Sequence, residues 1–262
     1  MYRTIDQLAA CQTNGSEVSI VQANICRLSI PRGPSEEYRV AQLDDYSNLP
    51  RKLFPHSPPT SVTFNARASS GQIPGTWGVG FWNDPFSLKL GFGGGTRRYP
   101  ALPNTAWFFF ASQENYLSLR DDLPANGRLA AVFQAPDTAV IFRLIGTPAS
   151  ALLLVPPLAR YLRKIARRFI HQEAVTCDII PTEWHSFAIR WQSNSLTFFV
   201  DDEISLETRC LPTPPLGLVI WIDNQFASFR KSGRLTFGTL ENLEEAWIEI
   251  ADLSLDSGPL FT

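Results

Sequence analysis

Apolar and polar residues alternate along much of the chain, and the pattern is clearest on either side of a polar break at 192–195. Before the break, Phe187, Ile189 and Trp191 fall on one side of an extended segment. After it, residues 196–201 repeat the same period of two. This period, together with the aromatic and β-branched residues and the short polar interruption, predicts two β-strands joined as a hairpin.

Segments with the same character recur from one end of the chain to the other. The predicted strands are 17–23, 26–30, 61–68, 77–84, 87–92, 105–112, 129–134, 139–145, 184–191, 196–201, 216–223 and 247–255. Four prolines between residues 44 and 60 indicate an extended loop, and residues 1–16 indicate a weakly ordered lead-in. Many short strands with turn residues between them are typical of a sandwich or barrel. We therefore expect one all-β domain over residues 1–262.

One segment breaks this pattern, and we expect a helical insertion at 151–171. Leu158, Leu162, Ile165 and Phe169 recur there at helical spacing. The positions between them are crowded with basic residues: Arg160, Arg163, Lys164, Arg167 and Arg168. A surface helix with solvated basic side chains explains this pattern. So does a basic amphipathic lid that contacts an anionic ligand or a membrane surface.

The predicted hairpin carries a recognisable motif. Residues 184–191 read Trp-His-Ser-Phe-Ala-Ile-Arg-Trp, and residues 196–202 read Leu-Thr-Phe-Phe-Val-Asp-Asp. They resemble the Trp/Phe-His-x-Tyr/Phe-x-Ile-x-Trp and Ile-x-Phe-x-Val-Asp-Gly segments of concanavalin A-like lectin and glucanase sandwiches, including family 16 glycoside hydrolases. Residues 75–82 look like the Gly-x-Trp-Pro-Ala-x-Trp strand of those enzymes, and 247–255 look like their last strand. The resemblance, over residues 61–256, implies an antiparallel jelly-roll sandwich.

The same family carries a Glu-x-Asp-x-x-Glu strand, in which one acid is the nucleophile and another is the general acid/base. The strand expected in that place, 105–112, reads Thr-Ala-Trp-Phe-Phe-Phe-Ala-Ser. Aromatic residues, Trp107 and Phe109 among them, stand where the family has acids, and Glu114 follows too late. The resemblance therefore implies the fold but no catalytic residue, and ordinary glycan hydrolysis is not expected.

Two Trp-x-Asp units supply candidate catalytic residues in place of the missing acids. Strand alternation puts Trp82 on the same face as Asp84, and Trp221 on the same face as Asp223. A carboxyl group in an aromatic cleft tends to keep its proton and can act as an acid near neutral pH. We therefore take Asp84 and Asp223 as candidate catalytic residues. The alternative is that both acids form turns at strand ends.

Aromatic and amide side chains near these units complete the candidate site. The candidate ligand-binding residues are Trp82, Trp107, Phe109, Trp221, Asn224 and Gln225. Asn224 and Gln225 can each donate and accept hydrogen bonds. Gly78 and Gly80 share a face with Trp82, and glycines there leave room for a ligand to approach the backbone.

Composition narrows the classes of function. The formal net charge of −2 argues against a general nucleic-acid binder. Three scattered histidines give no metal-ligand spacing, and we expect neither a metal nor a cofactor. The four cysteines lack Cys-x-x-Cys spacing and are expected to be free thiols. Without an apolar signal core or a run of 18 apolar residues, we expect a cytoplasmic protein, and the sequence leaves its oligomeric state open.

Three hypotheses about function follow. The leading one is a non-hydrolytic protein that takes a small, largely apolar ligand in an aromatic cleft and isomerises or cyclises it by acid/base chemistry. The first alternative is a carbohydrate-binding protein, or an atypical glycoside hydrolase derived from the family 16 fold. The second is a membrane-surface or scaffolding protein that works through the basic helix at 160–168.

Overall fold

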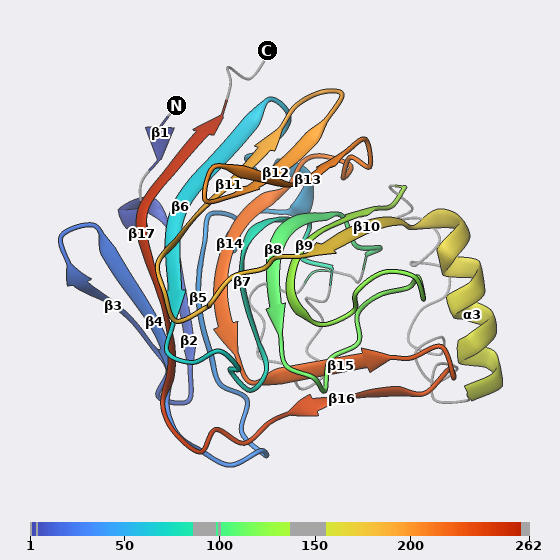
Figure 1. Cartoon of the computed structure of the whole chain (residues 1–262), viewed down its shortest axis with the longest axis horizontal. Coiled ribbons are helices and arrows are strands. Elements are labelled where there is room, and N and C mark those ends of the chain that lie inside the picture. Colours follow the sequence, from blue (N-terminus) through green and yellow to red (C-terminus); the bar gives the residue numbers. More distant parts are fainter. Residues whose placement is uncertain (1, 4, 86–97, 99–100, 137–155, 258–262) are drawn as a thin grey trace.

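Two large antiparallel sheets form the body of the molecule, with a helix of 14 residues at one end (Figure 1). The computed structural model describes residues 2–3, 5–85, 98, 101–136 and 156–257. Two predicted strands, 87–92 and 139–145, lie outside the described residues, as does the start of the predicted insertion. None of the helices in the described ranges is long and apolar enough to cross a membrane.

The strands pair antiparallel within each sheet. The eight-stranded sheet has the order β13 (Glu203–Thr208), β12 (Leu196–Val200), β11 (His185–Trp191), β6 (Thr60–Ala68), β17 (Ala246–Ser257), β4 (Ile25–Ile30), β3 (Glu17–Gln22), with β1 (Tyr2–Arg3) paired to β17. The seven-stranded sheet has the order β10 (His171–Thr176), β9 (Gly127–Gln134), β8 (Thr105–Ala111), β7 (Thr76–Trp82), β14 (Gly217–Asp223), β5 (Val40–Asp44), β2 (Ala9–Thr13). The remaining elements are the hairpin β15 (Gln225–Phe229) and β16 (Leu235–Thr239), the short 3-10 helices η1 (Ile5–Gln7) and η2 (Arg51–Leu53), and α3 (Pro156–Phe169).

The hairpin predicted from alternation is present as β11 and β12. Phe187 lies opposite Val200, and Trp191 lies opposite Leu196. The chain then turns into β13 through Asp201 and Asp202, which have φ angles of 50° and 65°. Two consecutive residues with positive φ are what a tight hairpin turn requires, and Asp tolerates this conformation better than most residues.

The inner faces of the two sheets meet in an aromatic core. Phe81, Phe108, Trp191 and Phe198 are among its fully buried side chains. The ring centroid of Phe108 lies 4.8 Å from that of Phe187 and 5.3 Å from that of Phe198, both edge to face. Such pairs stabilise a core beyond the burial of their area. Inward positions alternate with outward ones along the strands of both sheets, which confirms the predicted all-β sandwich.

Several strands have no counterpart among the predicted ones: β1, β2, β5, β10, β13, β15 and β16. The lead-in expected at 1–16 contains η1 and β2, and β2 pairs with β5. β2 and β10 are edge strands, which pair on one flank only and carry more polar residues than central strands. Their alternation is correspondingly weak in the sequence. All four cysteines are free thiols, as expected.

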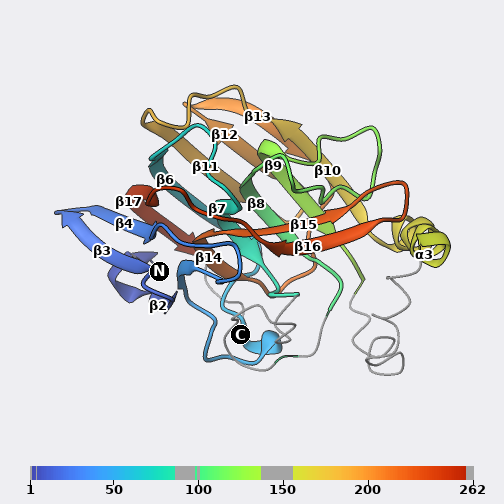
Figure 2. The ribbon, with the colours of Figure 1, turned by 90° about the horizontal axis from the view of Figure 1, so that it is seen from below.

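Helix α3 confirms the predicted helix between β9 and β10, but not all of its basic residues are solvated. The Arg163 side chain is buried and donates to the Asp121 carboxylate at 3.0 Å and to the Ser118 carbonyl at 2.9 Å. Arg167 also approaches Asp121, at 3.6 Å. Figures 1 and 2 both place the far end of the β15–β16 hairpin beside α3, and the Arg163 guanidinium lies 5.9 Å from the Phe229 ring. Arg163 therefore fixes the helix to the rest of the molecule.

Candidate functional site

Four candidate ligand-binding residues gather on the outer face of the seven-stranded sheet, which we call the aromatic face: Trp82, Trp107, Phe109 and Trp221. Trp107 lies at their centre, with its ring centroid 5.1 Å from Phe109, 5.5 Å from Trp221 and 6.1 Å from Trp82. The residues come from the adjacent strands β8, β7 and β14. Outward-pointing side chains on neighbouring strands meet in this way because a strand alternates its two faces.

The glycines of β7 let the indoles lie close to the sheet. A Cβ atom at Gly78 would come within 2.6 Å of the Trp221 ring, and one at Gly80 within 2.5 Å of the Trp107 Cβ. The space over these glycines, predicted to be open to a ligand, is thus filled by the protein's own side chains. The reason is that the large residues stand on the two neighbouring strands and pack across the smaller β7 positions.

Other parts of the chain cover most of the aromatic face. Trp107, Phe109 and Trp221 keep only 7%, 5% and 8% of their surface exposed. The apolar residues packed on this cluster come from the segment after β5, the β8–β9 connection and α3, and include Tyr46, Leu49, Phe54, Leu117, Leu119 and Ala166. Trp82 is only half-buried. Solvent therefore reaches the aromatic face at its Trp82 end.

One indole N–H group on the aromatic face, Trp107 Nε1, is buried without a hydrogen-bond partner in the described structure. The other two indoles differ, because Trp221 Nε1 donates to Thr76 Oγ1 at 2.9 Å and the Trp82 indole interacts with the Tyr46 hydroxyl. An unpaired buried donor costs about 1–3 kcal/mol relative to a paired one. The Trp82 end of the aromatic face therefore holds one donor, Trp107 Nε1, from which an oxygen atom of a ligand could accept a hydrogen bond.

Asp223 lies at the other end of the aromatic face. Its carboxyl group accepts hydrogen bonds from Thr76 Oγ1 at 2.8 Å and from the Gln225 backbone N–H at 3.2 Å. Burial raises the pKa of Asp223 to about 7, and the hydrogen bonds only partly oppose this effect. A carboxyl group with such a pKa can take up and release a proton near neutral pH.

Two titratable residues are absent from the sequence-based site: Tyr38, near Asp223, and Cys11, near Tyr38. Burial, and to a smaller degree the charges of Asp223 and Cys11, raise the pKa of Tyr38 well above its usual value. Burial and the nearby charge of Asp44 raise the pKa of the Cys11 thiol. Cys11 lies on the unpredicted strand β2, and Tyr38 precedes the unpredicted strand β5. The alternation within 40–44 is the sequence signal that could have located this group.

Asp84 is held in an ion pair with Arg98. The same guanidinium donates to the carbonyls of Tyr46 at 2.8 Å and Leu49 at 2.7 Å. Burial raises the pKa of Asp84, and Arg98 opposes the shift. The charge of Asp44 also raises this pKa, but both Asp44 oxygens accept hydrogen bonds, from Gln42 Nε2 and from the backbone N–H groups of Tyr46 and Ser47. Asp84 thus anchors Arg98 and, through it, the segment after β5.

The two candidate catalytic acids lie at opposite ends of the same strand pair. Trp82 lies opposite Gly217, and Thr76 lies opposite Asp223. The six-residue offset between these pairs corresponds to about 20 Å along a strand. Glycoside hydrolysis by two carboxyl groups needs a separation of about 5–9.5 Å. Asp84 and Asp223 therefore cannot act together on one bond.

The two candidate amides are used differently. Asn224 is fully buried, and its Nδ2 donates to the carbonyls of Glu37 at 2.9 Å and Leu240 at 2.8 Å. Its Oδ1 accepts from the Arg39 backbone N–H at 2.9 Å. These bonds tie the end of β14 to two other segments. The Gln225 Nε2 is buried without a partner in the described structure, so Gln225 keeps a donor for a ligand and Asn224 does not.

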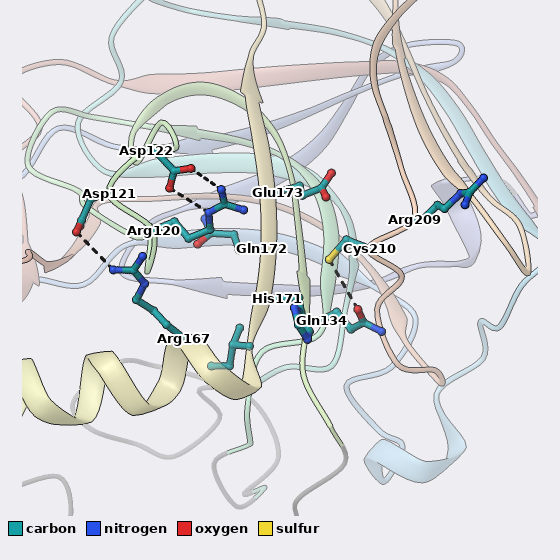
Figure 3. A pocket seen from close by; sticks show the side chains of 11 residues that line it. Arg120, Asp121, Asp122, Gln134, Arg167, His171, Gln172, Glu173, Arg209 and Cys210 are labelled. Atoms are coloured by element: carbon teal, nitrogen blue, oxygen red, sulfur yellow. Dashed lines mark hydrogen bonds and ion pairs between the residues drawn. The ribbon is translucent and has the colours of Figure 1, made fainter.

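A cavity of about 930 Å³ opens at the edge strand β10 (Figure 3). Charged side chains of both signs line it, among them Arg120, Asp121, Asp122, Arg167, Glu173 and Arg209. Arg120 pairs with Asp122, and Arg167 pairs with Asp121. None of the candidate catalytic or ligand-binding residues lines this cavity, but Arg167 of the predicted basic helix does. Because opposite charges are paired within its walls, the cavity favours neither anionic nor cationic ligands.

Comparisons with known proteins assign the chain to no family. No family model matches the chain, and a search of curated proteins finds no match. Among solved structures, the β-glucanase of Bacillus licheniformis has 10% identity, covers 99% of this chain and 98% of its own, and has a TM-score of 0.48. The legume lectin-like domain from Entamoeba histolytica has 10% identity, coverages of 95% and 90%, and a TM-score of 0.48. The Crh5 transglycosylase in complex with NAG has 10% identity, coverages of 97% and 80%, and a TM-score of 0.47.

The architecture itself is a concanavalin-like β-sandwich. Two antiparallel sheets of eight and seven strands pack face to face, and the first and last parts of the chain lie in the same sheet, where β1 pairs with β17. The resemblance seen in the sequence is thereby confirmed at the level of fold. At 10% identity no residue role is transferred from these neighbours.

Proposed function

We propose that this chain is a carbohydrate-binding protein without hydrolytic activity, and that the Trp82 end of the aromatic face receives the ligand. The observation that carries the proposal is the unpaired indole donor Trp107 Nε1, whose ring adjoins the half-buried ring of Trp82. The half-buried Trp82 ring is the part of this tryptophan cluster that solvent reaches.

A sugar complements the groups at this end of the aromatic face better than a wholly apolar ligand does. The C–H face of a pyranose ring can lie against an indole, and its ring and hydroxyl oxygens can accept hydrogen bonds. An apolar ligand would leave the Trp107 N–H group unpaired, at a cost of about 1–3 kcal/mol. This difference favours a carbohydrate over the small apolar ligand of the leading sequence hypothesis.

The absence of hydrolysis in the proposal rests on the acids of this face. Asp84 is engaged by Arg98, and Asp223 is about 20 Å of strand away from it. These two acids therefore do not form a hydrolytic pair, and Asp44, whose charge also acts on Asp84, has both carboxyl oxygens engaged in hydrogen bonds.

Isothermal titration with cellotriose, laminaritriose and maltotriose tests the proposal. We expect at least one trisaccharide to bind, and Trp82→Phe or Trp107→Phe to weaken binding about tenfold, because the first variant replaces the half-buried indole by a smaller ring and the second loses the unpaired donor. Trp191→Phe is the matched control, since Trp191 Nε1 is also unpaired but lies in the core between the sheets. Absence of binding, or equal losses in all three variants, contradicts the proposal.

One observation supports a second candidate function, proton transfer at Asp223. Its pKa of about 7 suits general acid or base chemistry on a small molecule, and Gln225, whose backbone N–H donates to Asp223, keeps an unpaired Nε2. In that case Asp223→Asn would lower turnover about a hundredfold while leaving the fold intact. Screening metabolites for thermal stabilisation identifies the substrate needed for this assay. Equal turnover by parent and variant would exclude Asp223 as the proton-transfer group.

A further inference from the structure

The outer face of the eight-stranded sheet carries an alternating row of arginines and tryptophans. The Arg27 guanidinium lies 4.5 Å from the Trp247 ring centroid, and that of Arg67 lies 4.9 Å from Trp184 and 5.7 Å from Trp247. Between the two arginines, the Glu249 carboxylate accepts hydrogen bonds from Arg27 at 2.6 Å and Arg67 at 2.8 Å. We call these five residues the arginine–tryptophan row. It fixes the position of the outermost indole, Trp184.

A groove of about 410 Å³ lies beside this row, and we call it the Trp184 groove. Its lining includes Asn24, Ile25, Asn65, Trp184, Ala251 and Asp252. Trp184 keeps 39% of its surface exposed, although it is held by Arg67 on one side. A large aromatic side chain that is both exposed and held in place is a ready surface for stacking.

An irregularity in β17 builds the polar wall of the groove. The register between β17 and β6 shifts between Ala251 and Ser254, and Asp252 has a φ of 52°. This bulge turns Asp252 so that its Oδ2 accepts a hydrogen bond from Asn65 Nδ2 at 3.1 Å. The backbone N–H of Asp252 donates to the carbonyl of Asn24, at 3.3 Å, in the turn between β3 and β4. Strand ends far apart in sequence are thereby joined around one groove.

The groove combines three kinds of surface. Ile25 and Ala251 supply apolar contact, Trp184 supplies a flat aromatic wall, and Asp252 and Asn65 supply adjacent polar groups. One oxygen of the Asp252 carboxylate and the Asn65 Oδ1 have no partner in the described structure. Two neighbouring acceptors can bind two neighbouring hydroxyl groups.

We infer that the Trp184 groove is a binding site for one pyranose ring with a vicinal pair of hydroxyl groups. The ring would stack on Trp184, and its hydroxyls would donate to Asp252 and Asn65. A volume of about 410 Å³ lies in the usual range for small-ligand sites. The single carboxylate disfavours an anionic ligand, and the described residues hold no group of three or more side chains able to bind a metal ion. The inference does not rest on the aromatic face.

The chain labelled with 5-fluorotryptophan allows each indole to be observed separately. It contains seven tryptophans, whose ¹⁹F resonances can be assigned with single Trp→Phe variants. Each of cellotriose, laminaritriose and maltotriose is titrated to about 20 mM, well above a millimolar dissociation constant, in EDTA to remove divalent cations. We expect the Trp184 resonance to shift and to saturate with at least one of the three sugars.

Matched variants separate the groove from the rest of its face. Trp184→Ala and Asp252→Ala should each weaken the binding about tenfold, as measured by ligand-detected NMR. Trp247→Phe is the control, because Trp247 belongs to the arginine–tryptophan row but does not line the groove. An equal loss in Trp247→Phe and Trp184→Ala would overturn the inference, as would an unshifted Trp184 resonance with all three sugars.

The same titration distinguishes this inference from the proposed function. A shift at Trp184 with unchanged resonances of Trp82 and Trp107 supports the groove and contradicts binding at the aromatic face. The reverse result overturns the groove and supports the aromatic face. All three indole resonances could shift, with the Trp184 shift and the Trp82 and Trp107 shifts weakened by different single variants. That result supports two separate sites.

Discussion

The two outer faces of the sandwich both carry tryptophan, but the tryptophans differ in their exposure to solvent. On the seven-stranded sheet the indoles pack on one another, and Trp107 and Trp221 are 7% and 8% exposed under other segments of the chain. On the eight-stranded sheet Trp184 stacks against an arginine and remains 39% exposed. Outward-pointing aromatic residues are therefore not by themselves an open surface. Where other segments cover such residues, they form a second core. Where nothing covers them, they form an exposed surface on which a ligand can stack.

The acids on the two faces differ in the same way. Asp223 is buried without a cation, and burial raises its pKa to about 7. Burial would also raise the pKa of Glu249, but the hydrogen bonds and charges of Arg27 and Arg67 outweigh it and lower this pKa below its usual value. The two faces should consequently respond to pH with opposite signs.

The largest effect is expected from Asp223. Its pKa is about 7 in the folded protein, against 3.8 as the ordinary value, so between these values the folded state holds a proton that the unfolded chain has lost. The free energy of unfolding is therefore highest below pH 4 with respect to this group. It falls by on the order of 4 kcal/mol as the pH rises from about 4 to 7. Asp223→Asn should remove this loss.

Urea unfolding from pH 4 to pH 8 measures this prediction. The free energy of unfolding of Asp223→Asn, relative to the parent, should increase steadily between about pH 4 and 7 and then level off. Asp202→Asn is the matched control, since Asp202 is exposed and carries no role on either face. A difference between parent and Asp223→Asn that is constant with pH would show that the carboxyl group is charged throughout.

Next in size is the effect of filling the aromatic face. Gly78→Ala places a methyl group against the Trp221 ring and the Phe108 carbonyl, and we expect it to lower the free energy of unfolding by about 3 kcal/mol. Gly71→Ala is the control, because a Cβ atom there would meet nothing within 4 Å. If both variants were equally stable, Trp221 would not be packed on β7, and the aromatic face would be open.

A smaller effect is expected on the opposite face. Glu249→Gln removes the charge shared by Arg27 and Arg67, whose side chains are 33% and 36% exposed, so we expect a loss of about 2 kcal/mol rather than that of a fully buried pair. The loss should be complete above pH 4.5 and should shrink as the pH falls, because the lowered pKa stabilises the folded state only while Glu249 is ionised. Urea unfolding at several pH values, with the exposed Glu244→Gln as control, provides the measurement. A loss that grew at acid pH would contradict this account.

The fold was largely accessible from sequence because central strands of a sandwich alternate strongly. β11, β12 and β14 place large apolar residues inward at every second position, and this pattern survives without knowledge of their partners. Edge strands such as β2 and β10 pair on one flank and show no such pattern. Their position depends on contacts with distant segments, which no local period encodes.

The candidate site was accessible only in part. Alternation places Trp82, Trp107 and Trp221 on one face, and the structure brings these rings together. The alternation cannot reveal that other segments cover these rings. Nor can it reveal that the Asn224 side chain makes all its hydrogen bonds with backbone groups. Alternation also does not show how far apart Asp84 and Asp223 lie, because that distance depends on the register of β7 and β14.

The central claim, binding of a carbohydrate without its cleavage, can be tested in one sample by saturation-transfer difference NMR. The protein is mixed with the trisaccharide that binds best, and spectra are recorded over a day. The account predicts saturation transfer to the protons of the sugar ring, weaker in Trp82→Phe, while the anomeric signals stay unchanged. Absence of saturation transfer with every trisaccharide, or the growth of new reducing-end anomeric signals, would contradict it.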